Sequence, residues 1–519
     1  MLFFHLMESK KKFAINGLAQ LFSFLVSIGI TFFLTPYIVS RLGAAAYGFV
    51  GLASNFVSYA QIVAIALNSM AGRFITISVH QNDIEKARKY FSSVFYSNII
   101  LVAFISIIGV AVLYKLERII DIPPENLKDV KILFGCIFIN FFISIIFNVY
   151  NVSTFIRNRL DLSSTRTIVA NSLKAMLLVG MFYFFDPAVW YIGLATVVST
   201  TYIILTNIHF RRKLTPDLVI KFKYFDIKSI KELLSAGVWN TVSRLSGLLQ
   251  HGFDLLIANL FIGPTEMGIL AIIKRIPTLT LTLFEQLNAI FAPPWTKLYA
   301  QNKFDELHEN IKQSLRIFGF LSFIPTAFIF VFCDWFYQMW LPSQDAKLLH
   351  LLTMAGCIEL PLAMPLQPIY NIFPLTNRLK ANAVFNIVIY SLTFVTVVIG
   401  TYITDNSLTR MILIAGTGSF FSLSKALLFL PIYGSKCIKI KASSLYLGMS
   451  RSAVAFGIIL VPLFFFKSRI STISWASLAA SAMACCIFGI IIGYSIILNK
   501  NDRSEINKMF KKGLSHFCK

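Results

Sequence analysis

Long apolar stretches separated by short polar connections run from one end of the chain to the other. About fourteen of these stretches are long enough to cross the ~30 Å hydrocarbon core of a bilayer as helices. They begin near Phe13, Tyr47, Phe91, Val130, Arg166, Ala188, Ala236, Glu266, Ser314, Ala346, Ala381, Leu408, Gly448 and Ser474. The pattern predicts an all-α integral membrane protein.

Lys and Arg concentrate in alternate connections of this pattern. The rich connections include residues 10–12, 86–89, 211–231 and 297–316, whereas the connections between them carry only a thin scatter of basic residues. Because loops rich in Lys and Arg are retained in the cytoplasm, both termini are expected there. Both termini on one side require an even number of crossings, and fourteen satisfies this condition.

Composition excludes a soluble globular protein. Hydrophobic residues make up 56% of the chain and charged residues 14%, and the mean hydropathy is +0.71. The longest polar interval, residues 209–234, is far shorter than a domain. The net charge of +23 would suggest nucleic acid as the partner of a soluble protein. Here the basic residues lie in loops on one face, so we expect contact with anionic lipid and no nucleic acid.

The cysteines show no pattern typical of disulfides or metal sites. Cys136, Cys333, Cys357, Cys485 and Cys486 lie inside or at the ends of apolar stretches, and no pair has the Cys-x-x-Cys spacing. We therefore expect small buried hydrophobic side chains without a metal.

An internal repeat divides the chain. Adding 220 to a residue number in the first quarter maps Gly43 to Gly263, Gly48 to Gly268 and Asn68 to Asn288, and also maps Gln81-Asn82 to Gln301-Asn302. We predict two pseudo-symmetric six-helix lobes, residues 1–210 and 236–440, joined by a cytoplasmic amphipathic linker, residues 211–235. Residues 441–519 add two helices and a basic cytoplasmic tail. A shift of six crossings gives both lobes the same orientation, so a pseudo-two-fold axis along the membrane normal should relate them.

Asn82-x-x-Glu85 predicts a capped start for the third span.

The loop after the first span carries a family resemblance. Arg41-Leu42-Gly43-Ala44-Ala45-Ala46-Tyr47-Gly48 follows an apolar helix with Asn16, Gln20, Thr35 and Pro36. Residues 261–268 are a weaker copy. The segment resembles the first hairpin of polysaccharide-repeat-unit flippases, of the O-antigen and capsule type, in the multidrug/oligosaccharidyl-lipid/polysaccharide exporter superfamily. The resemblance implies two lobes around a central cavity and alternating access in a bacterial plasma membrane. It also implies an undecaprenyl-pyrophosphate-linked oligosaccharide as substrate, with a polysaccharide polymerase complex as a further partner.

Ionisable residues inside apolar spans are costly in lipid and are therefore candidates for function. On a regular helix, the seventh span places its polar residues within one arc: Asn240, Ser243, Arg244, Gly247, His251 and Asp254. The eighth span presents Lys274, Thr278, Thr282 and Glu285 on one face, with Arg275 beside them. Lys174 and Lys425 add further cations. Glu359 lies among Pro361, Pro365 and Pro368, where we expect broken backbone.

A pyrophosphate head group needs fixed positive charge to replace its hydration. Arg244, Lys274 and Arg275 are the leading candidates for this cationic cavity, with Lys174 and Lys425 in support. Internal pairing of Arg244 with Asp254 or Glu285 is the structural alternative. Asp254, Glu285 and Glu359 are candidates for coupling to a proton or sodium gradient, and His251 for a proton relay. No prosthetic group or catalytic residue is expected.

Three other functions remain open. A cation-coupled drug antiporter of the multidrug-extrusion branch shares the expected fold, but the first span here has no acidic residue and the candidate cavity is cationic. A lipid II or spore-wall type lipid flippase is nearer. A membrane glycosyltransferase or polymerase would need an outer loop with catalytic carboxylates or a His/Arg set, and the outer loops are short, with Asp121-Ile-Pro-Pro-Glu125 as the sole acidic cluster.

Overall fold

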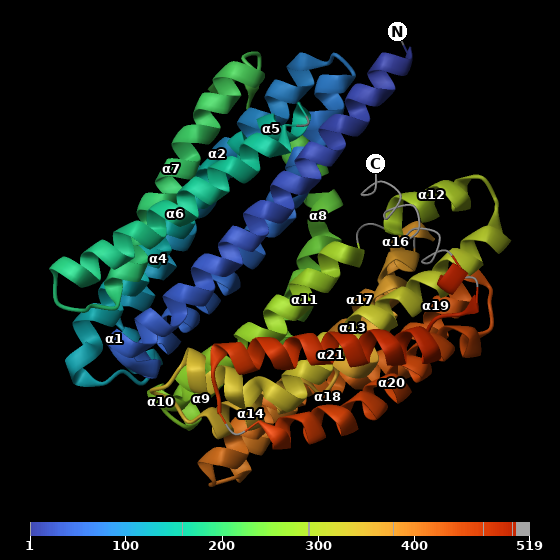
Figure 1. The fold of residues 1–519 in the computed structure, drawn as a ribbon. Coiled ribbons are helices and arrows are strands. Elements are labelled where there is room, and N and C mark those ends of the chain that lie inside the picture. The colour runs from blue at the N-terminus through green and yellow to red at the C-terminus, as the bar shows by residue number, and fades with distance from the viewer. Residues whose placement is uncertain are drawn as a thin grey trace. The chain divides into compact units, whose positions relative to one another are not determined.

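The computed structural model describes residues 2–157, 159–288, 291–376, 378–470, 472–500 and 502–504 (Figure 1). Several side chains, among them those of residues 2–18 and of Ser243 and His251, are not part of the description. Helix accounts for 89% of the described residues, and no strand occurs among them. The all-α class is therefore confirmed. Residues 505–519 of the predicted basic tail lie outside the described residues.

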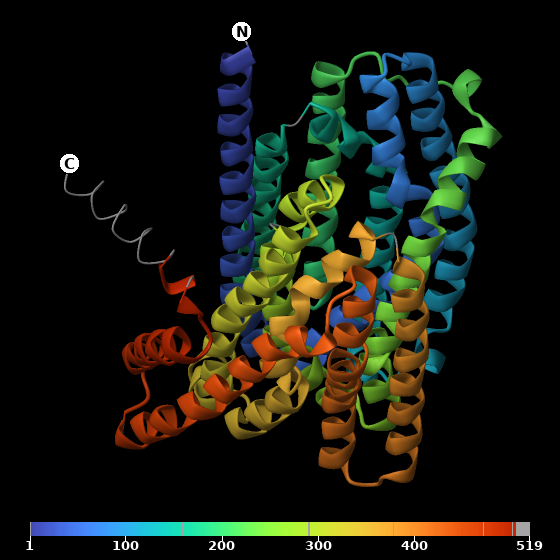
Figure 2. The same cartoon turned by 90° about the vertical axis from the view of Figure 1, so that its right-hand side faces the viewer.

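Two compact units make up the chain, Met1–Ala271 and Ile272–Lys519. In the first unit, α2, α4, α6, α7 and the N-terminal part of α1 run side by side (Figures 1 and 2). Its helices are α1 Leu2–His80, α2 Ile84–Tyr114, α3 Leu116–Ile119, η1 Pro124–Asn126, α4 Leu127–Phe147, η2 Asn148–Asn151, α5 Val152–Ile156, α6 Leu160–Phe184, α7 Trp190–Leu214, η3 Phe222–Tyr224, α8 Ile227–Gly247, η4 Leu248–Gly252 and α9 Asp254–Phe261, with α10 Pro264–Ile273 at the boundary.

In the second unit, α13 is the central element and contacts α14, α20 and α21. Arg316 of α13 also holds the segment after α21, because its Nε lies 2.6 Å from an oxygen of Asp502. The helices are α11 Arg275–Asn288, α12 Ala292–Ala300, α13 Phe304–Trp340, α14 Ala346–Cys357, α15 Leu360–Ala363, η6 Met364–Asn371, α16 Ile372–Leu375, α17 Leu379–Ile403, α18 Ser407–Leu428, α19 Leu430–Ile438, α20 Ala442–Arg469 and α21 Trp475–Ile496.

Twelve helices within the described residues are long and apolar enough to cross a membrane. The first of them, Phe22–His80, has 59 residues, about twice what one crossing needs, and Gly43 leaves the helical conformation inside it. The segment from α8 to α9 is not among the twelve. The count of fourteen crossings therefore stays a prediction.

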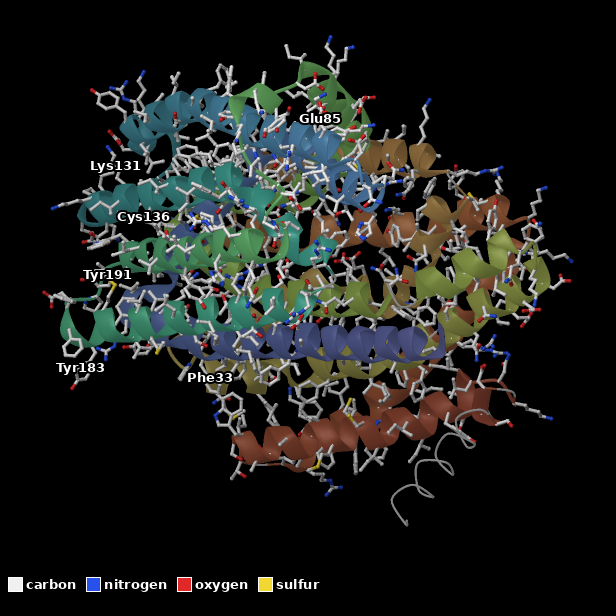
Figure 3. All side chains as sticks on the ribbon, turned by 90° about the horizontal axis from the view of Figure 1, so that it is seen from above. Phe33, Glu85, Lys131, Cys136, Tyr183 and Tyr191 are labelled. Carbon is white, nitrogen blue, oxygen red and sulfur yellow. The ribbon has the colours of Figure 1, made fainter. Side chains whose placement is uncertain are left out.

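Large apolar side chains cover the outside of the helices. Phe33 is 74% exposed and Tyr183 is 79% exposed, and both lie on the surface of the first unit (Figure 3). Such a surface is unfavourable in water and suits contact with lipid. Among the described cysteines, Cys333, Cys357 and Cys485 are buried as expected, whereas Cys486 is exposed.

The backbone repeats its unusual conformations at the shift of 220 residues. Gly43 has φ 81° and Gly263 has φ 151°, and Asn82 and Asn302 have φ 60° and 56°. Glycine adopts positive φ without a steric penalty, and asparagine tolerates the left-handed region better than most residues. The two asparagines therefore make the same left-handed turn in both halves, and both glycines have positive φ, which supports the register of the repeat. The predicted lobe boundaries stay predictions.

The start of α2 differs from the predicted cap. Asp83, not Asn82, is the N-cap residue, and its Oδ1 accepts a hydrogen bond of 3.0 Å from the Lys86 backbone N–H. Asn82 instead forms the left-handed turn just before it. Residues 211–235, predicted as a linker, are divided between the end of α7, an irregular segment with η3 and the first turns of α8.

Asp226 caps α8 and gives this helix a pH-dependent start. Its carboxylate accepts from the Ser229 N–H at 2.9 Å and from the Ser229 hydroxyl at 2.7 Å. These two bonds hold the pKa of Asp226 below its usual range. A depressed pKa contributes stability above the unfolded pKa of about 3.9, and this contribution is lost as the pH falls through the folded value.

We expect Asp226→Ala to lower the free energy of unfolding by about 1 kcal/mol at pH 7, because the first N–H groups of α8 lose their acceptor. Asp226→Asn is the matched control, since asparagine caps a helix without titrating. The measurement is thermal unfolding of the purified protein between pH 3 and 7. The Ala variant should differ from the parent at pH 7 and approach it at pH 3. Equal midpoints at pH 7 would contradict the capping role.

Candidate functional site

The polar residues of the seventh span do not form one continuous arc. A π-helical turn, η4, interrupts the α-helical register between α8 and α9. A π-turn adds a residue to the helix turn and shifts every later side chain around the axis. Accordingly, Arg244 at the end of α8 is exposed, whereas Asp254 at the start of α9 is only 6% exposed. The predicted single arc was wrong at this point, because it assumed 100° per residue throughout.

Side chains of α1 donate hydrogen bonds to a backbone carbonyl of the π-turn. The Gly252 carbonyl accepts from Asn55 Nδ2 at 2.9 Å and from the Tyr59 hydroxyl at 2.6 Å. The Tyr59 ring also stacks on Phe253, with 4.8 Å between centroids. Tyr59 interacts electrostatically with the buried Asp254. Helix α1 therefore holds the π-turn in place, and π-turns occur frequently at functional positions.

Glycines bring α1 against α8 and α10 in the same unit. A Cβ at Gly237 would lie 1.9 Å from the Ala66 carbonyl oxygen, and one at Gly268 would lie 2.0 Å from the Ala44 carbonyl oxygen. Gly48 and Gly268, equivalent in the repeat, contact each other, since a Cβ at Gly48 would lie 2.8 Å from the Gly268 Cα. Only glycine permits this approach. The close packing fixes the position of the helix that carries Arg244.

Arg244 is the candidate cation best placed for an anion in the first unit. Its side chain is exposed in the last turn of α8. No ion pair to Arg244 occurs among the described residues, so the predicted alternative of pairing with Asp254 does not occur there. Lys174 lies in the middle of α6 and is partly buried. The side chain of His251 lies outside the described residues.

In the second unit, Lys274 and Arg275 lie at the junction between α10 and α11. Lys274 occupies the turn between α10 and α11, and Arg275 is the first residue of α11. Lys274 is partly buried, and Arg275 is exposed. Glu285 lies near the other end of α11, where its side chain is exposed.

The second unit brings Lys425 and Glu359 together in its interior. Lys425 of α18 is 2% exposed and Glu359 is 5% exposed. Lys425 Nζ donates to the Tyr370 hydroxyl at 2.8 Å and lies 4.6 Å from the centroid of that ring. Glu359 interacts electrostatically with Lys425. A buried ammonium group requires such partners, so Lys425 belongs to an internal polar network.

The broken backbone expected around Glu359 is confirmed. Helix α14 ends at Cys357, Glu359 precedes the four-residue α15, and η6 continues as a 3₁₀ helix. Pro361 and Pro368 lie in these short helices, and proline removes a backbone donor from a helix. The break places Glu359 and Tyr370 side by side with α18. Glu285 of α11 also acts electrostatically on Tyr370.

The amide cluster around Asn68 was not predicted from the sequence. Asn68 Nδ2 donates to Asn98 Oδ1 at 2.9 Å, Asn98 Nδ2 returns a bond of 3.0 Å, and Asn148 Nδ2 donates to Asn68 Oδ1 at 3.3 Å. These residues come from α1, α2 and η2. The signal available in the sequence was an asparagine inside each of three apolar stretches, since uncharged amides in such stretches need partners.

Known proteins resemble this chain in sequence and in fold. Residues 38–347 match the family of polysaccharide biosynthesis proteins. The uncharacterized membrane protein EpsK of Bacillus subtilis (strain 168) is 26% identical over 506 residues, which are 96% of this chain and 98% of EpsK.

Two solved structures share the fold. The lipid II flippase MurJ, in an inward closed conformation, aligns with a TM-score of 0.64 and 11% identity over 93% of this chain and 98% of MurJ. An inward-facing multidrug resistance MATE family transporter of the MOP superfamily aligns with a TM-score of 0.63 and 16% identity, over 80% of this chain and 95% of the transporter. The sequence match covers more than half of the chain, and the chain is therefore a multi-pass membrane protein of the polysaccharide biosynthesis protein family.

Proposed function

We propose that this chain flips undecaprenyl-pyrophosphate-linked oligosaccharide repeat units across the bacterial plasma membrane for surface polysaccharide biosynthesis. It would move them from the cytoplasmic to the outer leaflet by alternating access, with both chain termini in the cytoplasm. The observation that carries the proposal is Arg244, an exposed guanidinium in a membrane transporter without an ion-pair partner among the described residues. A guanidinium presents a fork of donors that matches phosphate oxygens.

The remaining candidate residues divide into two roles in this proposal. Lys174 of the first unit and Lys274, Arg275 and Lys425 of the second are further candidates for binding the anionic head group, with Lys425 contributing from the interior of its unit. The acidic candidates Asp254, Glu285 and Glu359, with His251, couple release to a proton or sodium gradient. The partners are the lipid-linked oligosaccharide, membrane lipids and a polysaccharide polymerase complex. The chain itself forms and breaks no covalent bond, which agrees with relatives that are transporters.

A cation-coupled drug antiporter is the second candidate function. The fold shared with a MATE family transporter and the buried carboxylates of Asp254 and Glu359 favour it, because a carboxylate can bind an organic cation or a coupling ion. The exposed cations Arg244 and Arg275 oppose it, since they would repel a cationic drug.

Deleting the gene distinguishes the two functions. We expect the deletion strain to lose surface glycan and to accumulate lipid-linked repeat units in the inner leaflet, and the plasmid-borne chain to restore both. Susceptibility to cationic drugs should not change. Normal surface glycan together with increased susceptibility to cationic drugs would reject the flippase in favour of the antiporter.

A further inference from the structure

A cavity of about 650 Å³ lies inside the first unit, between the last turns of α1 and the segment formed by η2 and α5. Its volume falls in the range of about 300–1,000 Å³ that small-molecule sites occupy. Asn68, Arg73 and Thr76 line it from α1, and Asn148 and Asn151 line it from η2. None of the residues that line it is acidic. The cavity is therefore suited to an anionic or uncharged polar ligand.

Two guanidinium groups make the cavity positive. Arg73 lines it directly with an exposed side chain, and the described residues include no ion-pair partner for it. Arg166 of α6 lies behind the wall, 7% exposed, and its Nη2 donates to Asn151 Oδ1 at 3.3 Å and to Ser163 Oγ at 2.9 Å. Arg166 stays charged in a protein interior, so its field reaches the cavity through Asn151.

The amides of the wall suit hydroxyl groups. An asparagine side chain offers two donors and an acceptor, which matches groups that both donate and accept. Asn68 is held in place by Asn98 and by the Ala64 carbonyl, to which its Nδ2 donates at 3.0 Å. Asn148 and Asn151 are exposed, so they keep hydrogen-bonding capacity for a ligand. Guanidinium groups for a phosphate and amides for hydroxyls thus lie in one cavity.

Side chains fill the equivalent region of the second half. Asn151 and Asn371 are equivalent and end the 3₁₀ segments η2 and η6. In the second unit Asn371 Nδ2 donates to Asn288 Oδ1 at 2.9 Å, whereas in the first unit Asn148, three residues before Asn151, makes the similar contact with Asn68. Trp295, equivalent to Ile75, is 1% exposed there and packs in a core with Leu366 and Ile369. The first half keeps a smaller residue and a cavity where the second half has a buried tryptophan.

We infer that this cavity binds the phosphorylated sugar head group of the substrate, with Arg73 on the phosphate and the amides of Asn148 and Asn151 on sugar hydroxyls. The inference rests on the proposed function for the identity of the substrate and adds a second anion site to Arg244. The shared chemistry is a sugar bonded to phosphate or pyrophosphate. Such a group occurs at the head of a glycolipid and also in a soluble nucleotide sugar.

Binding to the purified full-length protein in phospholipid nanodiscs tests the inference with three probes. They are inorganic pyrophosphate, UDP-N-acetylglucosamine and geranyl-pyrophosphoryl-N-acetylglucosamine. Arg73→Gln removes the charge. Gly72→Leu keeps the charge and fills the cavity, because a Cβ at Gly72 has no neighbour closer than Val152 Cγ2 at 4.0 Å. Arg212→Gln, at an exposed arginine of α7, is the matched control.

We expect Arg73→Gln and Gly72→Leu each to weaken binding of a sugar-phosphate probe about 10- to 100-fold, since a hydrogen bond to a charged group is lost or blocked. Arg212→Gln should bind as the parent does. Weakening confined to UDP-N-acetylglucosamine assigns the cavity to a soluble ligand, and weakening with the geranyl probe assigns it to the lipid head group. Parental affinity of both variants for all three probes would overturn the inference. Loss of complementation by the parent chain, with binding intact, would instead reject the proposed function.

Discussion

Arg244→Gln is expected to reduce delivery of lipid-linked repeat units to the outer leaflet by about 10- to 100-fold. The exposed guanidinium at the end of α8 would lose its charge-assisted hydrogen bonds to the pyrophosphate, each about 1.5–3 kcal/mol. Arg244→Lys keeps the charge and loses the planar fork, so it should give an intermediate rate. The measurement is surface glycan, together with the lipid-linked repeat units that accumulate in the inner leaflet of a complemented deletion strain.

Arg118→Gln is the matched control, because Arg118 is an exposed arginine in the short helix α3. It should complement fully. Each variant must reach the membrane in the amount of the parent, so that a lower rate reports transport and not folding. Normal surface glycan in both Arg244→Gln and Lys274→Gln would remove these cations from the mechanism.

Lys425→Met and Glu359→Gln are expected to destabilise the second unit strongly when made singly. The two opposite charges interact electrostatically in the interior, so each single variant leaves one buried charge uncompensated, at a cost of roughly a few kcal/mol. The double variant should cost less than the two single variants together, because no uncompensated charge then remains. The measurement is a double-mutant cycle, in which thermal unfolding gives the stability of the purified parent, the two single variants and the double variant.

Tyr370→Phe is the control for the hydrogen bond alone. It removes the hydroxyl that accepts from Lys425 Nζ at 2.8 Å and keeps the ring, so it should cost about 1 kcal/mol. If the losses of Lys425→Met and Glu359→Gln simply add in the double variant, the two residues are energetically independent. The internal polar network described here would then be wrong.

The parts of the fold that depend on backbone conformation at single residues were largely predictable. Gly43 and Gly263 share positive φ, as do Asn82 and Asn302, because few residue types tolerate that region. The break near Glu359 followed from its prolines. In contrast, the π-turn before Asp254 depends on which carbonyl each backbone N–H selects, and α1 decides this through Asn55 and Tyr59. The residue pattern of the seventh span alone therefore does not predict the π-turn.

The candidate site was predicted less completely than the fold. Lys425 was predicted as a cation within an apolar span, but its partner Tyr370 comes from a 3₁₀ helix 55 residues away. The cavity of Arg73 was missed for a similar reason. Arg73 was not among the cations predicted for the site, and its neighbours Asn148 and Asn151 join it only because η2 folds back on α1. Contacts between residues so far apart in the sequence depend on tertiary packing.

The burial of the cysteines makes the chain suitable for thiol labelling in intact cells. Cys333, Cys357, Cys437 and Cys485 are buried, Cys136 is partly buried, and Cys486 is exposed. Replacing Cys486 and the tail residue Cys518 by serine should therefore leave a background of weakly reactive thiols. Single cysteines introduced into each connection would then report, with a membrane-impermeant maleimide, which connections face the periplasm or the medium and how many times the chain crosses the bilayer.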